Sequence, residues 1–120
     1  VFFYDKFLGD KIFDFMHFSD ICAVTSQEFE SFCLIILEAW STNTPVVSTK
    51  IGGTSEVILN NYNGLLVNKK NYSEFSHKLF KLLNDEKKMK ILGQRGYKTL
   101  INKFNVKKMT LEYYKELLQL

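Results

Sequence analysis

Two glutamates, Glu30 and Glu38, are the residues of this sequence best placed to do chemistry. Glu38 is the only charged residue between Phe32 and Trp40, and an ionised carboxylate on a mostly apolar helix is costly unless it is hydrogen-bonded. If Glu30 lies just before that helix and Glu38 in its second or third turn, the eight residues turn through about 800°, which leaves the two within about 80° of each other. We therefore expect the carboxylates to share a broad face, where each could accept two parallel hydrogen bonds from vicinal hydroxyls.

The expected start of this helix near Phe32 adds hydrogen-bond donors to the two acceptors. A helix start offers free backbone N–H groups and a positive dipole end to an anion, and open parallel sheets bind ligands beyond the carboxyl ends of their strands, where residues 25–31 should lie. Together these groups suit a ligand with both sugar and phosphate. The alternative is that Glu30 only stabilises its own helix through a favourable interaction with the helix dipole. Glu38 would then be an ordinary partly exposed residue, and Gly52-Gly53 a simple turn.

Apolar runs of strand length alternate with segments of helical composition along the whole chain. This alternation, with uninterrupted apolar strands, predicts one α/β domain with a Rossmann-like parallel sheet flanked by helices. Pro45 should open a strand, residues 71–74 resemble a capping box, and Gly93 and Gly96 should weaken the helix that contains them. The expected strands are 1–4, 21–25, 46–49 and 65–67, and the expected helices are 11–18, 32–41, 54–59, 71–83, 86–102 and 106–118.

Composition narrows the classes of partner. A net charge of +3 and aromatic residues that do not alternate with basic ones argue against nucleic-acid binding. Cys22 and Cys33 match no metal-ligand spacing, and we expect two reduced, packed thiols in a cytoplasmic protein, although Cys33 near a helix start could instead have a lowered pKa. His17 and His77 should be surface residues. With no apolar run near eighteen residues, we expect a soluble protein that could work at the inner face of a membrane.

Several motifs in one order and spacing resemble the donor-binding domain of the GT-B glycosyltransferases, especially the retaining family 4 group. The resemblance covers nearly the whole chain and is carried by Ser26, Glu30, Phe32, Leu37-Glu38-Ala39, Pro45-Val46-Val47, Thr49, Gly52-Gly53, Glu56 and Asn63-Gly64-Leu65-Leu66-Val67. It implies that Glu30 is the catalytic glutamate and faces hydroxyls of the donor sugar, and that Glu38 binds the ribose. It also implies that the backbone of Ser31, Phe32, Cys33 and Leu34 contacts the donor. Thr49, Gly52 and Gly53 would border the same pocket.

The sequence departs from the family pattern in two ways. Ser31 and Cys33 stand where the family usually has glycines, which could restrict the approach of the backbone to the sugar, and Asn43 also replaces a usual glycine. The family's Arg and Lys that neutralise the diphosphate come from an earlier segment, which the acceptor domain precedes. We therefore expect residues 1–120 to be a nucleotide-sugar-binding domain truncated on its amino-terminal side, and inactive in transfer by itself.

The resemblance implies a metal-independent, cofactor-free retaining hexosyltransferase. It would move a sugar from a nucleotide diphosphate sugar to a glycan or lipid-linked acceptor held by the missing domain, in cell-surface polysaccharide or glycoconjugate synthesis. The alternatives are a GT-B-type nucleotide-sugar epimerase and a non-catalytic sugar-nucleotide binding module. Because the family's last helix crosses back to the other domain, we expect Tyr113, Leu117 or Leu118 to be exposed or packed on a neighbouring chain.

Overall fold

The computed structural model describes residues 1–4 and 9–119. Its centre is a parallel sheet of three strands in the order β1 (Cys22–Val24), β2 (Val46–Lys50) and β3 (Leu65–Asn68). Cys22 pairs with Val46 across the first ladder, and Val47 pairs with Leu65 across the second. A helix lies in each crossover, as parallel neighbours require. The α/β class and the parallel sheet predicted from the alternating pattern are confirmed.

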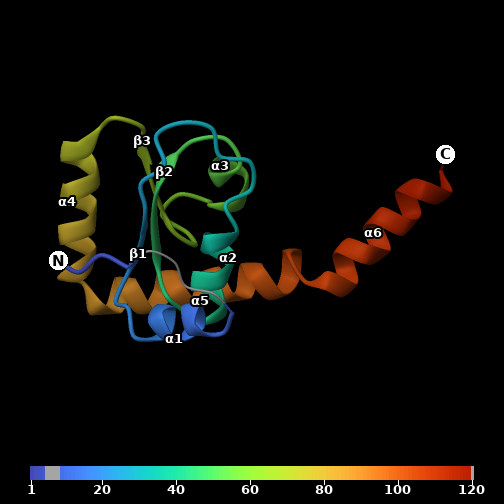
Figure 1. Cartoon of the computed structure of the whole chain (residues 1–120), viewed down its shortest axis with the longest axis horizontal. Helices are drawn as coiled ribbons and strands as arrows, with labels where there is room; N and C mark the ends of the chain where they lie inside the picture. The colour runs from blue at the N-terminus through green and yellow to red at the C-terminus, as the bar shows by residue number, and fades with distance from the viewer. Residues whose placement is uncertain (5–8, 120) are drawn as a thin grey trace.

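In the described part of the chain, six helices surround or extend from this sheet. Figure 1 shows α4 on one side of the sheet, α2 and α3 on the other, α5 passing across one end, and α6 projecting away from the body. Their bounds are α1 Lys11–His17, α2 Leu34–Ser41, α3 Thr54–Val57, α4 Tyr72–Leu83, α5 Glu86–Lys103 and α6 Val106–Leu118.

The core has two parts because side chains alternate between the faces of a strand. On one face, Val46 of β2 packs with Ile36 and Trp40 of α2. On the other face, Val47 packs with Leu82 of α4 and Leu92 of α5. All of these side chains are at most 1% exposed. The sheet is therefore covered on both faces, as expected for parallel strands with continuous apolar sequence.

The two glycines of α5 have a packing role that the sequence did not reveal. A Cβ added at Gly93 would lie 1.9 Å from the carbonyl oxygen of Asn43, and one added at Gly96 would lie 2.3 Å from a ring carbon of Trp40. Asn43 itself has a left-handed backbone with φ of 60°, as expected for a residue that closes a helix. The glycines let α5 lie directly against α2 and the turn after it, so the predicted weakening of the helix is offset by close packing.

One predicted strand is wrong, and two predicted helices have ends that differ by two residues from the structure. Residues 1–4 form no strand and are largely exposed, because a strand needs a neighbour for its backbone N–H and C=O groups and the three described strands pair only with one another. The helix expected from Phe32 begins at Leu34, because Cys33 has a left-handed backbone. The helix expected over 54–59 ends at Val57, because Ile58 is extended.

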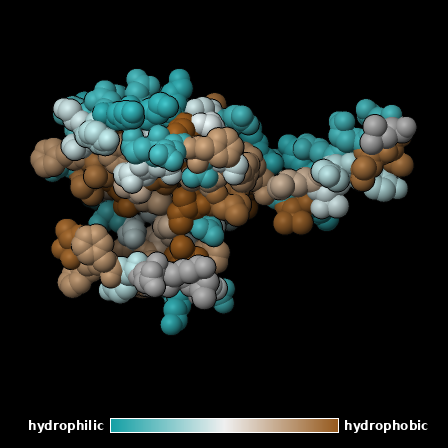
Figure 2. Space-filling model, turned by 45° about the horizontal axis from the view of Figure 1, so that its top comes forward, coloured by the Kyte–Doolittle hydropathy of each residue, from teal (hydrophilic) through white to brown (hydrophobic). Residues whose placement is uncertain are grey.

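The carboxyl-terminal half matches the expected pattern closely. The side chains of Asn71, Asp85 and Asn105 each accept a hydrogen bond from the backbone N–H three residues later and so cap α4, α5 and α6. Tyr113, Leu117 and Leu118 are exposed, which confirms the expectation for the last helix. Figure 2 shows hydrophobic atoms along this projecting helix. None of the helices among residues 1–4 and 9–119 combines the length and hydropathy needed to span a bilayer.

Candidate functional site

The loop between β1 and α2 carries the first glutamate. It leaves the carboxyl end of β1, the edge at which open parallel sheets bind ligands. Glu30 is half-buried, and its Oε2 accepts a hydrogen bond from Ser26 Oγ at 3.2 Å. Its carboxylate is therefore oriented by the protein and keeps lone pairs for a further donor.

The Gly52-Gly53 pair holds the backbone of this acidic loop. The Gly53 N–H donates to the Glu30 carbonyl oxygen at 3.0 Å. A Cβ added at Gly52 would lie 2.1 Å from that same oxygen, and one added at Gly53 would lie 1.9 Å from the carbonyl oxygen of Ser31. Gly52 also has a φ of +47°, which side chains rarely tolerate. Both glycines are therefore required by the loop, whatever else they contact.

Two buried threonines connect the carboxyl end of β2 to the same region. Thr49 is 2% exposed, and its hydroxyl donates to the Ser26 carbonyl oxygen at 2.6 Å. Thr54 Oγ1 donates to the Thr49 carbonyl oxygen at 2.8 Å and accepts from the Ile51 N–H at 3.0 Å. Sequence reasoning missed Thr54, although its place directly after the Gly-Gly pair was a usable signal. The hydrogen bonds of both threonines thus fix how β2 and its following loop meet the acidic loop.

The start of α2 presents free backbone donors beside the loop. Cys33 is the residue before the helix and has a φ of 60°. Within the described residues, the N–H groups of Leu34 and Ile35 have no hydrogen-bond acceptor, as expected for a first helical turn. Phe32 is 37% exposed and packs edge-on against Phe104, with the ring centroids 5.7 Å apart. These amides could bind an anion or hydroxyl oxygens.

The helical angle predicted between the two glutamates does not apply, because Glu30 lies outside α2 and a left-handed residue intervenes. The charges of the glutamates nevertheless act on two neighbouring thiols. Burial, and then the charge of Glu30, raises the pKa of Cys33 to about 11. Burial, then Cys33, and then Glu38 raises the pKa of Cys22 to about 11. Both cysteines are free and buried, as expected, and the suggestion of a lowered Cys33 pKa is wrong.

The remaining residues of the predicted site lie as follows. Glu38 is half-buried in the second turn of α2, whereas Ser31 and Leu34 are exposed. The imidazoles of His17 and His77 are exposed, as expected. Among residues 1–4 and 9–119, no group of His, Cys, Asp or Glu could hold a metal ion.

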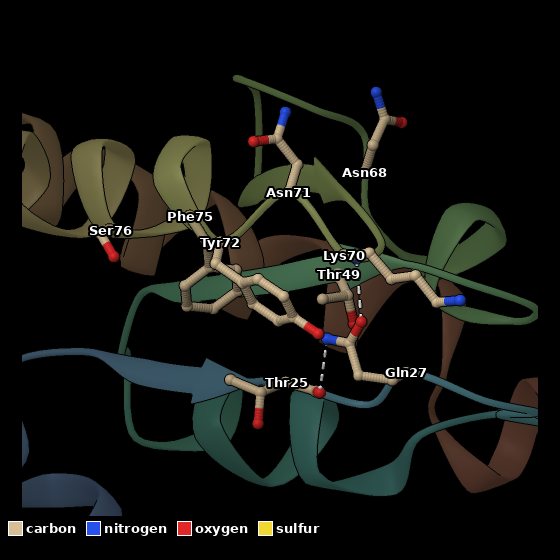
Figure 3. Close-up of a pocket in the computed structure, with 9 residues that line it drawn as sticks. All are labelled: Thr25, Gln27, Thr49, Asn68, Lys70, Asn71, Tyr72, Phe75 and Ser76. Atoms are coloured by element: carbon tan, nitrogen blue, oxygen red, sulfur yellow. Dashed lines mark hydrogen bonds between the residues drawn. The ribbon is translucent and has the colours of Figure 1, made fainter.

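A separate cavity of about 290 Å³ opens at the carboxyl ends of the strands, next to α4 (Figure 3). Its lining includes Thr49 but neither glutamate, and it includes several residues that sequence reasoning missed, such as Gln27, Lys70 and Tyr72. Gln27 comes soon after β1, and the other two come soon after β3. Their positions after parallel strands were the signal that could have identified them.

Comparison of this chain with known proteins identifies its family. The model of the family described as glycosyl transferases group 1 matches residues 1–99. The uncharacterized glycosyltransferase MJ1178 of Methanocaldococcus jannaschii is 34% identical over 119 residues, which cover 93% of this chain and 33% of that protein. The chain thus spans about a third of the length of this relative.

Solved structures agree with the family match. The crystal structure of HepE from Anabaena in complex with UDP-glucose has a TM-score of 0.86 at 25% identity, and the alignment covers 93% of this chain and 31% of that one. The C-terminal domain of the glycosyl transferase group 1 family protein LpcC from Francisella tularensis has a TM-score of 0.75 at 31% identity, covering 85% of this chain and 53% of that one. The chain belongs to the glycosyl transferases group 1 family, and its fold is that of the C-terminal domain of a GT-B glycosyltransferase.

Proposed function

We propose that this chain is the donor-binding part of a retaining glycosyltransferase that uses a nucleotide diphosphate sugar. The observation that carries the proposal is the support of the Glu30 loop by Gly52 and Gly53, next to the free N–H groups at the start of α2. Hydrogen-bond acceptors and donors thus lie close together at the edge of the sheet where α/β folds bind ligands. This combination suits a ligand that has sugar hydroxyls and a diphosphate.

Each group has a distinct role in this proposal. The Glu30 carboxylate, oriented by Ser26, accepts hydrogen bonds from hydroxyls of the donor sugar and keeps the reacting carbon in place. The Leu34 and Ile35 N–H groups and the positive end of α2 face the sugar or the diphosphate. Glu38, one turn further along the helix, accepts from the two ribose hydroxyls. The acceptor is a glycan or a lipid-linked sugar, and transfer proceeds with retention and without a metal ion.

The transfer step needs more positive charge than this site supplies. The leaving nucleoside diphosphate gains negative charge in the transition state, and fixed cations stabilise such charge most effectively. Neither the Glu30 loop nor the first turn of α2 contains Lys or Arg. The proposed division of labour is therefore that residues 1–120 bind the donor, while cations from outside this region drive the departure of the leaving group. HepE, with its bound UDP-glucose, supports the nucleotide-sugar assignment by similarity.

A binding experiment on the chain tests the assignment of the two glutamates. Ligand-observed NMR and thermal shift with UDP-, GDP- and ADP-glucose should show binding of at least one of them. Glu38→Ala should weaken it about tenfold or more, because a hydrogen bond to a charged group contributes about 1.5–3 kcal/mol. Glu30→Ala should weaken binding of the nucleotide sugar more than binding of the free nucleotide.

Glu28→Ala provides the matched control. It removes the same charge from the same loop, but Glu28 is exposed and has no role in the proposed site. Its affinity should equal that of the wild type. The proposal fails if none of the three nucleotide sugars binds at millimolar concentration, or if Glu38→Ala binds the donor as tightly as Glu28→Ala.

A further inference from the structure

The cavity beside α4 is a second candidate site, distinct from the pair of glutamates. It lies where three parallel strands end, with Thr25 just after β1, Thr49 near the end of β2 and Asn68 at the end of β3. Figure 3 shows the first turns of α4 closing the other side with Tyr72, Phe75 and Ser76. At about 290 Å³ it is close to the smallest ligand pockets of roughly 300 Å³, so one small ring is the right size of ligand.

The walls of the cavity are held by hydrogen bonds of their own. The Gln27 side chain donates to the Thr25 carbonyl oxygen at 3.0 Å and accepts from the Lys70 N–H at 2.9 Å. This amide therefore joins the loop after β1 to the loop after β3. Asn71 accepts from the Glu74 N–H at 3.1 Å and so caps α4. A ligand would find these groups already in position, which lowers the cost of binding.

Several polar groups in the lining still have unused hydrogen-bonding capacity. Among the described residues, the side-chain hydroxyls of Thr25, Tyr72 and Ser76 have no hydrogen-bond partner, and the Gln27 amide uses only one of its two N–H donors. A hydroxyl can rotate to donate or to accept, so it suits a ligand that itself carries hydroxyls. The lining therefore offers several groups that can each donate or accept a hydrogen bond, and it does not consist of donors alone or of acceptors alone.

The rings of Tyr72 and Phe75 supply an apolar surface beside these groups. Tyr72 is 66% exposed and Phe75 is half-buried, so the tyrosine face is available to a ligand. The C–H groups of a sugar ring carry small positive partial charges and are attracted to the negative face of an aromatic ring. Figure 3 shows the Lys70 side chain extending away from the two rings, and no carboxylate lines the cavity. On the side of the cavity that the two rings form, these features favour a neutral ring.

We propose that this cavity binds one neutral sugar ring, with its apolar face on Tyr72 and its hydroxyls toward Gln27, Thr25 and Ser76. Because Gln27 and Glu30 lie on the same loop, we assign the ring to one residue of the glycan acceptor, beyond the part of the acceptor that the resemblance assigns to the other domain. That role as an acceptor subsite rests on the proposed function. The binding of the ring itself rests on the cavity alone.

Saturation-transfer NMR with methyl α-glucoside, N-acetylglucosamine and maltose tests this proposal on the 120-residue chain. We expect binding of at least one of them with a Kd of roughly 1–10 mM, in line with a small ligand held by a few contacts. Tyr72→Ala should weaken it about fivefold or more, because the aromatic face is lost. Tyr72→Phe keeps that face and should stay within about threefold of the wild type.

Two control variants distinguish binding in this cavity from binding at another exposed ring or in the donor site. Tyr113→Ala makes the same substitution at an exposed tyrosine on α6, away from the cavity, and should bind the sugars as the wild type does. Glu38→Ala should weaken UDP-glucose binding about tenfold or more and bind the neutral sugars as the wild type does. If the sugars instead depend on Glu38 and not on Tyr72, they occupy the donor site and the proposal is overturned.

The remaining outcomes are equally decisive. Absence of binding by all three sugars at about 50 mM, well above the expected Kd, would overturn the proposal. Displacement of the sugar by uridine monophosphate in a Tyr72-dependent manner, with the same effect in Glu38→Ala, would assign the cavity to a nucleobase. Sugar binding that depends on Tyr72 in a chain that binds no nucleotide sugar would support the cavity and refute the proposed function.

Discussion

Gly53→Ala tests whether the Gly-Gly pair positions the acidic loop. Gly53 has a φ of −60°, which alanine adopts freely, so the substitution acts through space alone. The new Cβ would lie 1.9 Å from the Ser31 carbonyl oxygen and 2.8 Å from its carbonyl carbon, and both are backbone atoms. Because Cβ contacts below 3.0 Å do not occur, the two segments must move apart by about 1 Å.

This displacement should lower stability and donor affinity together. Overpacking of this kind costs about 1–3 kcal/mol, which corresponds to a fall in Tm of roughly 5–10 °C for a domain of this size. A shift of about 1 Å in a positioned group can cost up to about a hundredfold in function. We expect UDP-glucose affinity, measured by calorimetry on fully folded protein, to fall at least tenfold.

Gly93→Ala separates the effect on the loop from the effect on stability. Its Cβ would lie 1.9 Å from the Asn43 carbonyl oxygen and 2.9 Å from the carbonyl carbon, which is nearly the same clash in a place away from the acidic loop. It should lower Tm to a similar extent and leave donor affinity unchanged at a temperature where the protein is folded. If Gly53→Ala binds the donor as tightly as Gly93→Ala, the positioning role of the Gly-Gly pair is refuted.

Two further predictions follow from the threonine and cysteine contacts. Thr49→Val removes the donor to the Ser26 carbonyl oxygen, which should lower the free energy of unfolding in urea by about 1–3 kcal/mol; an unchanged unfolding midpoint would contradict this. With pKa values raised to about 11, Cys22 and Cys33 should react with iodoacetamide at pH 8 about a hundredfold more slowly in the folded chain than in the unfolded one. Their contribution to stability is complete below about pH 9 and lost as the pH rises toward 11, so a Cys22→Ala/Cys33→Ala variant should lack this part of the alkaline decline.

Local sequence signals were sufficient to predict the features that depend mainly on residues close together in the chain. The cap at Asn71 is a contact between residues three apart, and it is confirmed. The structure adds the same kind of cap at Asp85, where the sequence predicted only that a helix starts near residue 86. The strand after Pro45 is also confirmed, and four of its consecutive residues, Val46 to Thr49, are buried, as expected for a strand covered on both faces. The signal that predicts each of these features lies within a short stretch of sequence.

Features set by distant contacts could not be predicted in the same way. Residues 1–4 have the composition of a strand but stand outside the described three-stranded sheet. Gly96 looked like a weak point in a helix, and only the position of Trp40, more than fifty residues earlier, shows why a side chain would not fit there. Composition indicates which secondary structure a segment favours, whereas the elements that it packs against decide whether that structure forms.

In the acidic loop, local sequence was sufficient to predict the candidate residues, but distant contacts set the path of the backbone, which could not be predicted. Glu30 and Glu38 are recognisable from their types and spacing. The left-handed backbone at Cys33, however, delays the helix to Leu34 and takes Glu30 off its axis. What then fixes Glu30 is the Gly53 N–H, bonded to the Glu30 carbonyl oxygen across more than twenty residues. In the proposed donor site, the contact between the Gly-Gly turn and the loop is what holds Glu30, so substitutions at Gly52 or Gly53 should alter Glu30-dependent contacts before those made by Glu38.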